Sequence, residues 1–180
     1  MLTTAQNSTV KSNIAASGDM NTLPNTSDGA FAIADLYNLP ASPDFYVWRT
    51  NIPTQEVYDA ITWANLTPQD APDGTQLWLN RAMACQGKQF NLQTILTGRD
   101  FIDASKASVR TGFQDALTGL PSGVSGATRA AGWVALQLVM SRKATRLEKL
   151  LATGTGSQAS PATMGFEGSV SYQDIQTARA

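Results

Sequence analysis

The stretch Ala127-Thr-Arg-Ala-Ala-Gly-Trp-Val-Ala-Leu-Gln-Leu-Val-Met140 is the most apolar in the chain. Its large apolar side chains would point to nearly every side of a helix, and a helix that is apolar all round is typically buried. It is far shorter than the roughly 20 apolar residues that span a bilayer. We therefore expect this stretch to be the central helix of a mainly α-helical, soluble protein.

Other segments predict helices that pack around it. Thr145-Arg-Leu-Glu148 and Asp73-Gly-Thr-Gln76 have the form of capping boxes, in which a polar cap and a Glu or Gln three residues later satisfy the first backbone N–H groups of a helix. Apolar spacing and caps together predict further helices over residues 29–39 (capped by Ser27 or Asp28), 53–63, 73–87, 90–98, 104–117 (capped by Asp103 or Ser105), 145–151 and from Tyr172 (capped by Ser171, with Asp174).

Two segments are expected to be extended. Asp44-Phe-Tyr-Val-Trp-Arg-Thr-Asn51 is aromatic and lies between Pro43 and Pro53, and Phe166–Val170 is a short strand candidate after a glycine-rich connector. Residues 1–30 are rich in Asn, Thr, Ser and Gly and contain few large apolar groups, which is typical of a mobile arm. The predicted organisation is a flexible N-terminal arm (1–30), a compact helical bundle (31–152) and a C-terminal extension (153–180).

The charges of the 180-residue chain are unevenly distributed although they nearly cancel, at a net -1. Residues 1–80 are acidic and residues 81–149 are basic. Complementary patches of this kind attract each other, either within one subunit or between neighbouring subunits of a ring. The alternative, scattered and solvated charges, stays open at this point.

The composition excludes several classes of chemistry. There is no histidine, and Cys85 is the only cysteine, so His-based acid–base catalysis, Ser-His-Asp triads and His/Cys zinc sites are ruled out. Cys85 is expected to be a small buried hydrophobe. A chain without disulfides fits a reducing compartment, and the N-terminus lacks the basic start and apolar run of a secretory signal. We expect no enzyme activity and no cofactor.

Three weaker patterns have more ordinary explanations. The run Thr153-Gly-Thr-Gly-Ser157 resembles a phosphate-binding loop, but it follows a predicted helix and lacks the Gly-Lys-Ser/Thr ending. Asp100 and Asp103 could form a carboxylate pair or bind a hard cation, although helix capping by Asp103 explains that residue better. The basic segment 142–149 could contact nucleic-acid phosphates without reading sequence, or it could serve a helix end or pair with acidic neighbours.

Three blocks of the chain together resemble a family of tailed-bacteriophage virion structural proteins. They are Phe45-Tyr-Val-Trp-Arg-Thr50 continuing through Pro53-Thr-Gln-Glu-Val-Tyr-Asp-Ala-Ile61, then Ile102-Asp-Ala-Ser-Lys-Ala-Ser-Val-Arg110, then the end blocks 142–156 and 165–175. The resemblance implies a head-to-tail connector, or adaptor, in the neck of the virion. Such proteins form a ring, usually of twelve, beneath the portal, and have a helical body with terminal arms.

The resemblance implies the expected partners, and the sequence itself offers candidate site residues. Partners would be further copies of the chain, the portal protein and a tail or nozzle protein, with possible nonspecific contact to DNA and none to membrane. The protein would assemble in the host cytoplasm and remain in the virion neck. Candidate anchor or interaction residues, none of them catalytic, are Trp48, Arg49, Arg142, Lys143, Arg146, Phe166 and Tyr172. The alternative is another non-enzymatic capsid or tail accessory protein; a virion-borne wall hydrolase is a distant third.

Overall fold

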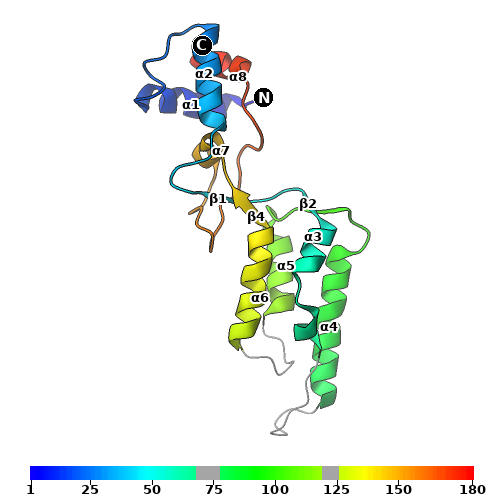
Figure 1. Cartoon of the computed structure of the whole chain (residues 1–180). Coiled ribbons are helices and arrows are strands. Elements are labelled where there is room, and N and C mark those ends of the chain that lie inside the picture. The colour runs from blue at the N-terminus through cyan, green and yellow to red at the C-terminus, as the bar shows by residue number, and fades with distance from the viewer. Residues whose placement is uncertain (68–77, 119–125) are drawn as a thin grey trace. The chain divides into compact units, whose positions relative to one another are not determined.

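The computed structural model describes residues 1–67, 78–118 and 126–180, with side chains described except at 78–81 and 126–130. The described part is mainly α-helical, as predicted, and Figure 1 traces its elements. The chain forms two compact units: unit 1 contains residues 1–47 and 143–180, and unit 2 contains residues 48–142. These boundaries differ from the predicted 1–30, 31–152 and 153–180. The predicted capping box at 73–76 and most of the predicted loop at 119–126 lie outside the described residues.

Unit 1 is built from both ends of the chain. Its helices are α1 (Thr4–Ala16), α2 (Ser27–Asn38), α7 (Arg146–Leu151) and α8 (Tyr172–Arg179). Helix α8 packs against α1 and α2, and α7 packs against the same two helices. The largest apolar side chains buried between them are Val10, Ile14, Met20, Ile33, Tyr37, Leu147 and Ile175. This core exists only when the N-terminal and C-terminal segments are folded together.

Local capping explains where these helices begin. Thr145 with Glu148, and Ser171 with Asp174, form complete capping boxes, which confirms both sequence predictions. A third capping box, Thr3 with Gln6, begins α1. Helix α2 is capped by the hydroxyl of Thr26 and not by Ser27 or Asp28, because the helix begins at Ser27, two residues before the predicted start at 29.

The structure does not show the extended arm predicted for residues 1–30. Residues 4–16 form α1, and Val10 and Ile14 on one face of it are buried against α8. The apolar content of this segment is low, so a sequence argument based on composition cannot see the partner surface that covers those two side chains. That surface is supplied by residues more than 150 positions away in the sequence.

The C-terminal extension is tied to unit 1 by hydrogen bonds, and residues 166–170 do not form the predicted strand. Val170 exchanges two hydrogen bonds with the side-chain amide of Asn38, at 2.9 and 3.0 Å. Gln6 donates to the carbonyl of Gly165 at 2.7 Å. Because side-chain amides occupy these backbone groups, the segment is held without a neighbouring strand.

Unit 2 is mostly helical with short paired strands. Its elements are β2 (Ile52–Pro53), α3 (Thr54–Ala60), the 3₁₀-helix η1 (Trp63–Leu66), α4 (Trp78–Leu96), β3 (Phe101–Ile102), α5 (Ala107–Leu117) and α6 (Gly126–Val139). Strands β2 and β3 are antiparallel, with Ile52 opposite Ile102. Strands β1 (Tyr46–Trp48) and β4 (Ser141–Lys143) pair where the chain passes from one unit to the other.

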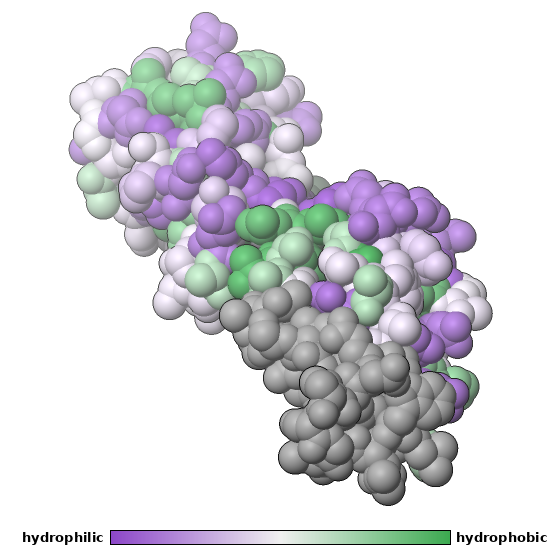
Figure 2. Space-filling model, turned by 60° about the horizontal axis from the view of Figure 1, so that its bottom comes forward, coloured by the Kyte–Doolittle hydropathy of each residue, from purple (hydrophilic) through white to green (hydrophobic). Residues whose placement is uncertain are grey.

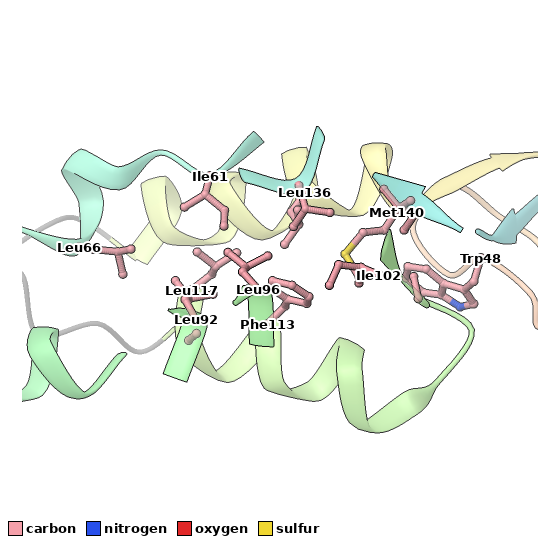
Figure 3. Packing of buried hydrophobic residues seen from close by; sticks show 14 residues of the cluster. Trp48, Ile61, Leu66, Leu92, Leu96, Ile102, Phe113, Leu117, Leu136 and Met140 are labelled. Atoms are coloured by element: carbon pink, nitrogen blue, oxygen red, sulfur yellow. The ribbon is translucent and has the colours of Figure 1, made fainter. Parts of the chain in front are cut away.

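The core of unit 2 lies between α3, α4, α5 and α6, and Figure 3 shows its side chains. Phe113 of α5 is fully buried, and α5 packs against both α4 and α6. The neighbouring elements contribute Trp48, Ile52, Val57, Ile61, Leu66, Leu92, Leu96, Ile102, Leu136 and Met140. Helix α5 is therefore the central helix of this unit, whereas the sequence assigned that role to residues 127–140.

Four helices predicted for this unit, over residues 53–63, 73–87, 90–98 and 104–117, have different bounds in the structure. Residues 78–96 form one continuous helix, α4, because Gly87 keeps helical geometry and neither ends nor interrupts it. The helix predicted over 53–63 ends at Ala60 and is followed by η1. Helix α5 begins at Ala107 and not at 104, since Asp103 accepts hydrogen bonds from Ser105 in a turn before the helix and does not cap it.

Candidate protein-interaction surfaces

Helix α6 carries an exposed apolar stripe. Ala131, Val134, Ala135 and Leu138 are spaced by three, one and three residues, so they share one face, and all four are exposed. Val134 and Leu138 are 53% and 47% exposed to solvent. The opposite face, with Leu136 and Met140, is buried in the core of unit 2. We name these four residues the α6 stripe.

The prediction that residues 127–140 are buried on most sides is therefore only half right. The apolar composition predicted burial within the chain, but in the described part of unit 2 one side of α6 packs against α3 and α5. The spacing of the stripe is visible in the sequence, and it is the pattern of a helix seam that packs against a further helix or groove. What the sequence did not reveal is that the described part of this chain leaves that face uncovered.

Helix α4 also presents apolar side chains to solvent. Met83 and Phe90 lie two turns apart on one face, with Gly87 between them, and both are exposed. Figure 2 shows a patch of apolar residues on the visible face of the molecule, bordering the grey residues. Exposed apolar side chains that gather on one helix face mark surfaces on which proteins bind.

A pocket of about 430 Å³ lies between α3, η1 and α4. Tyr58 and Trp63 form one wall, with ring centroids 4.6 Å apart, and the Trp63 indole N–H donates to the carbonyl of Tyr58 at 3.1 Å. The remaining lining residues are Thr54, Gln89, Gln93, Leu96 and Thr97. The mixture of aromatic rings and uncharged amides suits an apolar side chain or backbone group from another protein better than a charged ligand. We name this the α3–α4 pocket.

Trp48 and Arg49 stabilise unit 2 internally. Trp48 is only 6% exposed, and the guanidinium of Arg110 lies over its ring, 4.7 Å from the ring centroid. Arg49 pairs with Glu56 at 2.7 Å and also donates to the carbonyl of Val139 at 2.9 Å. Both residues therefore stabilise the fold, as the sequence suggested for Trp48. The Trp48 ring and the Arg49 guanidinium are engaged within unit 2 and do not form a binding surface.

The cations of the basic segment 142–149 are largely engaged within unit 1. Lys143 pairs with Asp44 at 2.7 Å, and Arg146 pairs with Asp19 at 2.8 Å. The hydrogen bond from Arg146 lowers the pKa of Asp19 to about 2. Arg142 is half-buried and has interactions of its own. These pairs join the acidic front of the sequence to its basic middle within one chain, which weakens the argument for phosphate contacts.

Lys149 lies at the edge of a smaller pocket. Its ammonium is 5.7 Å from the ring centroid of Phe45 and 3.4 Å from the carbonyls of Ser42 and Pro43. The pocket, about 230 Å³, is lined by Asn13, Ser17, Tyr37, Ser42, Arg146, Lys149 and Leu150. Burial raises the pKa of the Tyr37 phenol to about 12, and its hydroxyl donates to Asn13 at 2.8 Å. The phenol therefore has a hydrogen-bonding role and no acid–base role near neutral pH.

Phe166 and Tyr172 belong to the packing of unit 1. Phe166 is half-buried against the unit 1 core. Tyr172 stacks on Phe31 with ring centroids 4.0 Å apart, so that α8 and α2 share an aromatic pair. Phe31 is half-exposed. The stack closes the α2–α8 contact and leaves one edge of Phe31 at the surface.

Asp103 and Cys85, which were considered for catalysis or metal binding, have ordinary structural roles. Burial raises the pKa of Asp103, but hydrogen bonds from Ser105 and the nearby ammonium of Lys106 outweigh that effect, and the net pKa is lowered. Cys85 is buried, as predicted, and burial raises the pKa of its thiol. Among the described residues, no group of three or more acidic or cysteine side chains is placed to hold a metal ion.

Comparison with known proteins places no further constraint on the site. No protein-family model, curated protein or solved structure matches this chain. Within the described part, none of the helices is long and apolar enough to cross a membrane.

Proposed function

We propose that this chain is a non-enzymatic structural protein of a tailed-bacteriophage virion, and that it acts as a head-to-tail adaptor forming a ring between the portal and the tail. The observation that carries the proposal is the α6 stripe. Four apolar residues on one exposed helix face would cost stability and solubility in an isolated monomer, and such a face is typical of a protein whose function is to bind other proteins.

Two further observations support this function. The blocks 45–61, 102–110, 142–156 and 165–175 resemble tailed-bacteriophage virion structural proteins, and this resemblance implies an adaptor. Unit 1 and unit 2 each have a separate hydrophobic core, so one unit can bind a portal or tail protein while the other binds neighbouring subunits. The exposed apolar residues of unit 2 and the half-exposed Phe31 of unit 1 provide a surface for each role.

The proposal is tested by the mass of the purified protein in solution, alone and with the portal protein of the same phage. Light scattering over a salt series is expected to show either a ring or assembly on the portal. Because each described ion pair lies within one unit of a single chain, salt should affect this assembly only modestly. A chain that remains monomeric and does not bind portal would refute the adaptor function and favour a capsid or tail accessory protein.

An enzymatic function has its own test. The distant alternative of a wall hydrolase would use Asp100 or Asp103. Asp103 is held in a turn by Ser105 and Lys106, so it is poorly suited to acid–base catalysis. Turnover of cell-wall material that is lost in Asp100→Asn or Asp103→Asn variants would contradict the proposed function.

A further inference from the structure

The smaller pocket beside Lys149 is lined by several hydrogen-bond donors and by no acidic side chain. Its volume is about 230 Å³, and all of its lining residues belong to unit 1. We name it the Lys149 pocket. Its properties can be judged without reference to the α6 stripe, which belongs to unit 2. The site therefore stands or falls separately from the adaptor function.

Lys149 has no carboxylate partner. Its side chain is half-buried, and its ammonium contacts the carbonyls of Ser42 and Pro43, both at 3.4 Å, and the ring of Phe45. A normal N–H···O hydrogen bond spans roughly 2.7–3.2 Å, so both carbonyl contacts are long. Within the described part of the chain, no acidic side chain lies at ion-pair distance from this ammonium. A half-buried ammonium held this way would gain from a closer, anionic acceptor.

The acidic side chains nearest to it in sequence or space are engaged elsewhere. Asp44 pairs with Lys143 at 2.7 Å. Glu148 accepts hydrogen bonds from two backbone N–H groups, at 3.0 and 3.2 Å. Asp19 pairs with Arg146 at 2.8 Å and so balances the second cation that lines the pocket. The lining is therefore left with one positive charge without a counter-ion, that of the ammonium.

Tyr37 fixes the orientation of a neutral donor in the same pocket. Its phenol keeps its proton near neutral pH, because burial raises the pKa to about 12, and it donates to the side-chain oxygen of Asn13 at 2.8 Å. Since the oxygen of that amide accepts from the phenol, its NH₂ group is turned to the other side. No acceptor for this NH₂ lies within hydrogen-bonding distance in residues 1–67, 78–118 and 126–180. Asn13 thus offers a donor that the fold itself does not use.

The lining suits a single carboxylate better than a nucleic-acid backbone. Binding to nucleic acid takes several cations that follow successive phosphates. In the basic segment, Lys143 and Arg146 are paired with acids, and Arg142 has interactions of its own. Lys149 is left as one isolated charge. Leu150 adds apolar surface beside it, against which the methylene groups of an acidic side chain can pack.

We propose that the Lys149 pocket binds a carboxylate group on the side chain of another protein. The ammonium of Lys149 pairs with the carboxylate, the NH₂ of Asn13 donates a hydrogen bond to it, and Leu150 contacts the methylene groups that carry it. No covalent bond forms or breaks. In an adaptor, this pocket would give unit 1 the means to recognise an acidic residue of its partner.

A pair of capped tripeptides tests the site on the full-length chain. Acetyl-Ala-Glu-Ala-amide carries the carboxylate, and acetyl-Ala-Gln-Ala-amide has the same shape without the charge. In an NMR titration of isotope-labelled protein at constant ionic strength, the Glu peptide should shift the side-chain NH₂ signals of Asn13 and the backbone signals around Lys149 in a saturable way. The Gln peptide should cause no saturable shift.

Substitutions assign the binding to the pocket. Lys149→Met keeps an apolar stem beside Phe45 but removes the charge, and it should weaken binding of the Glu peptide by about tenfold or more, the effect of losing a charged hydrogen bond. Lys143→Met is the matched control. It removes the same charge from unit 1, but Lys143 does not line the pocket, so the affinity should stay within about twofold of the wild type.

A second pocket variant covers the case in which Lys149→Met does not fold. Asn13→Asp keeps an acceptor for the Tyr37 hydroxyl and replaces the NH₂ donor by a carboxylate oxygen. Repulsion between like charges should then abolish binding of the Glu peptide. An unchanged affinity in Asn13→Asp would refute the site.

The remaining outcomes also decide. Equal shifts with the Glu and Gln peptides, or equal losses in Lys149→Met and Lys143→Met, would refute carboxylate binding in the pocket. Saturable shifts with inorganic phosphate but not with the Glu peptide would refute it in favour of a phosphate ligand. None of these results touches the adaptor function, which is tested by the mass of the protein with and without portal.

Discussion

Arg146 and Asp19 form an ion pair between residues that are 127 positions apart in the sequence, with Nη1 of Arg146 2.8 Å from Oδ2 of Asp19. The pair connects the start of α7 to the segment that follows α1, and so it joins the two ends of the chain within unit 1. Ser17 donates a second hydrogen bond to the same carboxyl group. This ion pair thus joins the acidic and basic parts of the sequence within one chain.

The first prediction concerns pH. The pKa of Asp19 falls from 3.8 to about 2 on folding, so its ionised form favours the folded state. The contribution is present above the unfolded pKa and is lost as the pH falls through the folded value, in the window from 3.8 to about 2. Thermal unfolding followed by circular dichroism should show that Asp19→Asn loses part of this acid dependence.

The control for the first prediction is a double-mutant cycle. Arg146→Gln should reduce the acid dependence in the same way, and the double variant Asp19→Asn/Arg146→Gln should lose little more than either single variant. Fully additive effects of the two substitutions would show that the two side chains act independently. In that case the ion pair would not be the cause of the lowered pKa.

The second prediction compares two phenylalanines in unit 2. Phe113 is completely buried at the centre of the core, whereas Phe90 is 68% exposed. Phe113→Ala should lower the free energy of unfolding by about 3–5 kcal/mol, and Phe90→Ala by less than about 0.5 kcal/mol. All four tryptophans lie in residues 48–142, so tryptophan fluorescence in a denaturant titration reports unit 2 specifically. Equal effects of the two substitutions would contradict the described core.

The third prediction concerns the C-terminal helix. Deletion of residues 172–180 removes Ile175 and Ala178, which pack with Val10 and Ile14 of α1 in the core of unit 1. Hydrogen exchange should then show loss of amide protection in α1, because that helix has a weak intrinsic tendency to form without a packed face. Tryptophan fluorescence of unit 2 should stay unchanged. Continued protection of α1 in the truncated chain would refute the discontinuous organisation of unit 1.

The fourth prediction compares two glycines of the C-terminal extension. Gly156 and Gly168 both have positive φ, at 67° and 107°, so alanine strains the backbone at either position. A Cβ at Gly168 would enter open space, whereas a Cβ at Gly156 would overlap the ring of Phe45. Gly168→Ala should cost about 1–2 kcal/mol and Gly156→Ala clearly more. Thermal unfolding of the two variants measures the difference, and equal costs would show that the Phe45 ring moves aside freely.

Local signals explain why some of the fold was predictable. The capping boxes at Thr145 and Ser171 involve residues three positions apart, so their hydrogen bonds form wherever the chain is placed. The amphipathic spacing of residues 104–117 predicted a helix with Phe113 on its buried face, and the structure confirms a helix over Ala107–Leu117 with Phe113 buried. The predicted start of that helix was wrong, because the Asp103 carboxylate accepts a hydrogen bond from the Ser105 N–H in the turn before the helix and does not cap the helix. Such a turn, like a cap, involves only residues close in sequence.

The candidate site was less predictable, for a reason that lies in α6. The apolar residues of α6 indicate that both faces of the helix are shielded from water. The sequence does not show whether the shielding surface belongs to the same chain or to another. The structure leaves Val134 and Leu138 exposed and assigns burial to Leu136 and Met140. Among the residues predicted as anchors, Trp48, Arg49 and Tyr172 have contacts that stabilise their own unit.

The sequence by itself determined the helical class, the capped starts of α7 and α8, and the absence of histidine-based chemistry, because these depend on residue identity and on neighbours within one helical turn. Only the tertiary structure decided that residues 4–16 are a packed helix, that the chain ends build one unit together, and that one face of α6 remains open. Each of these depends on contacts between distant segments, and composition carries no information about which distant surface will cover a given side chain.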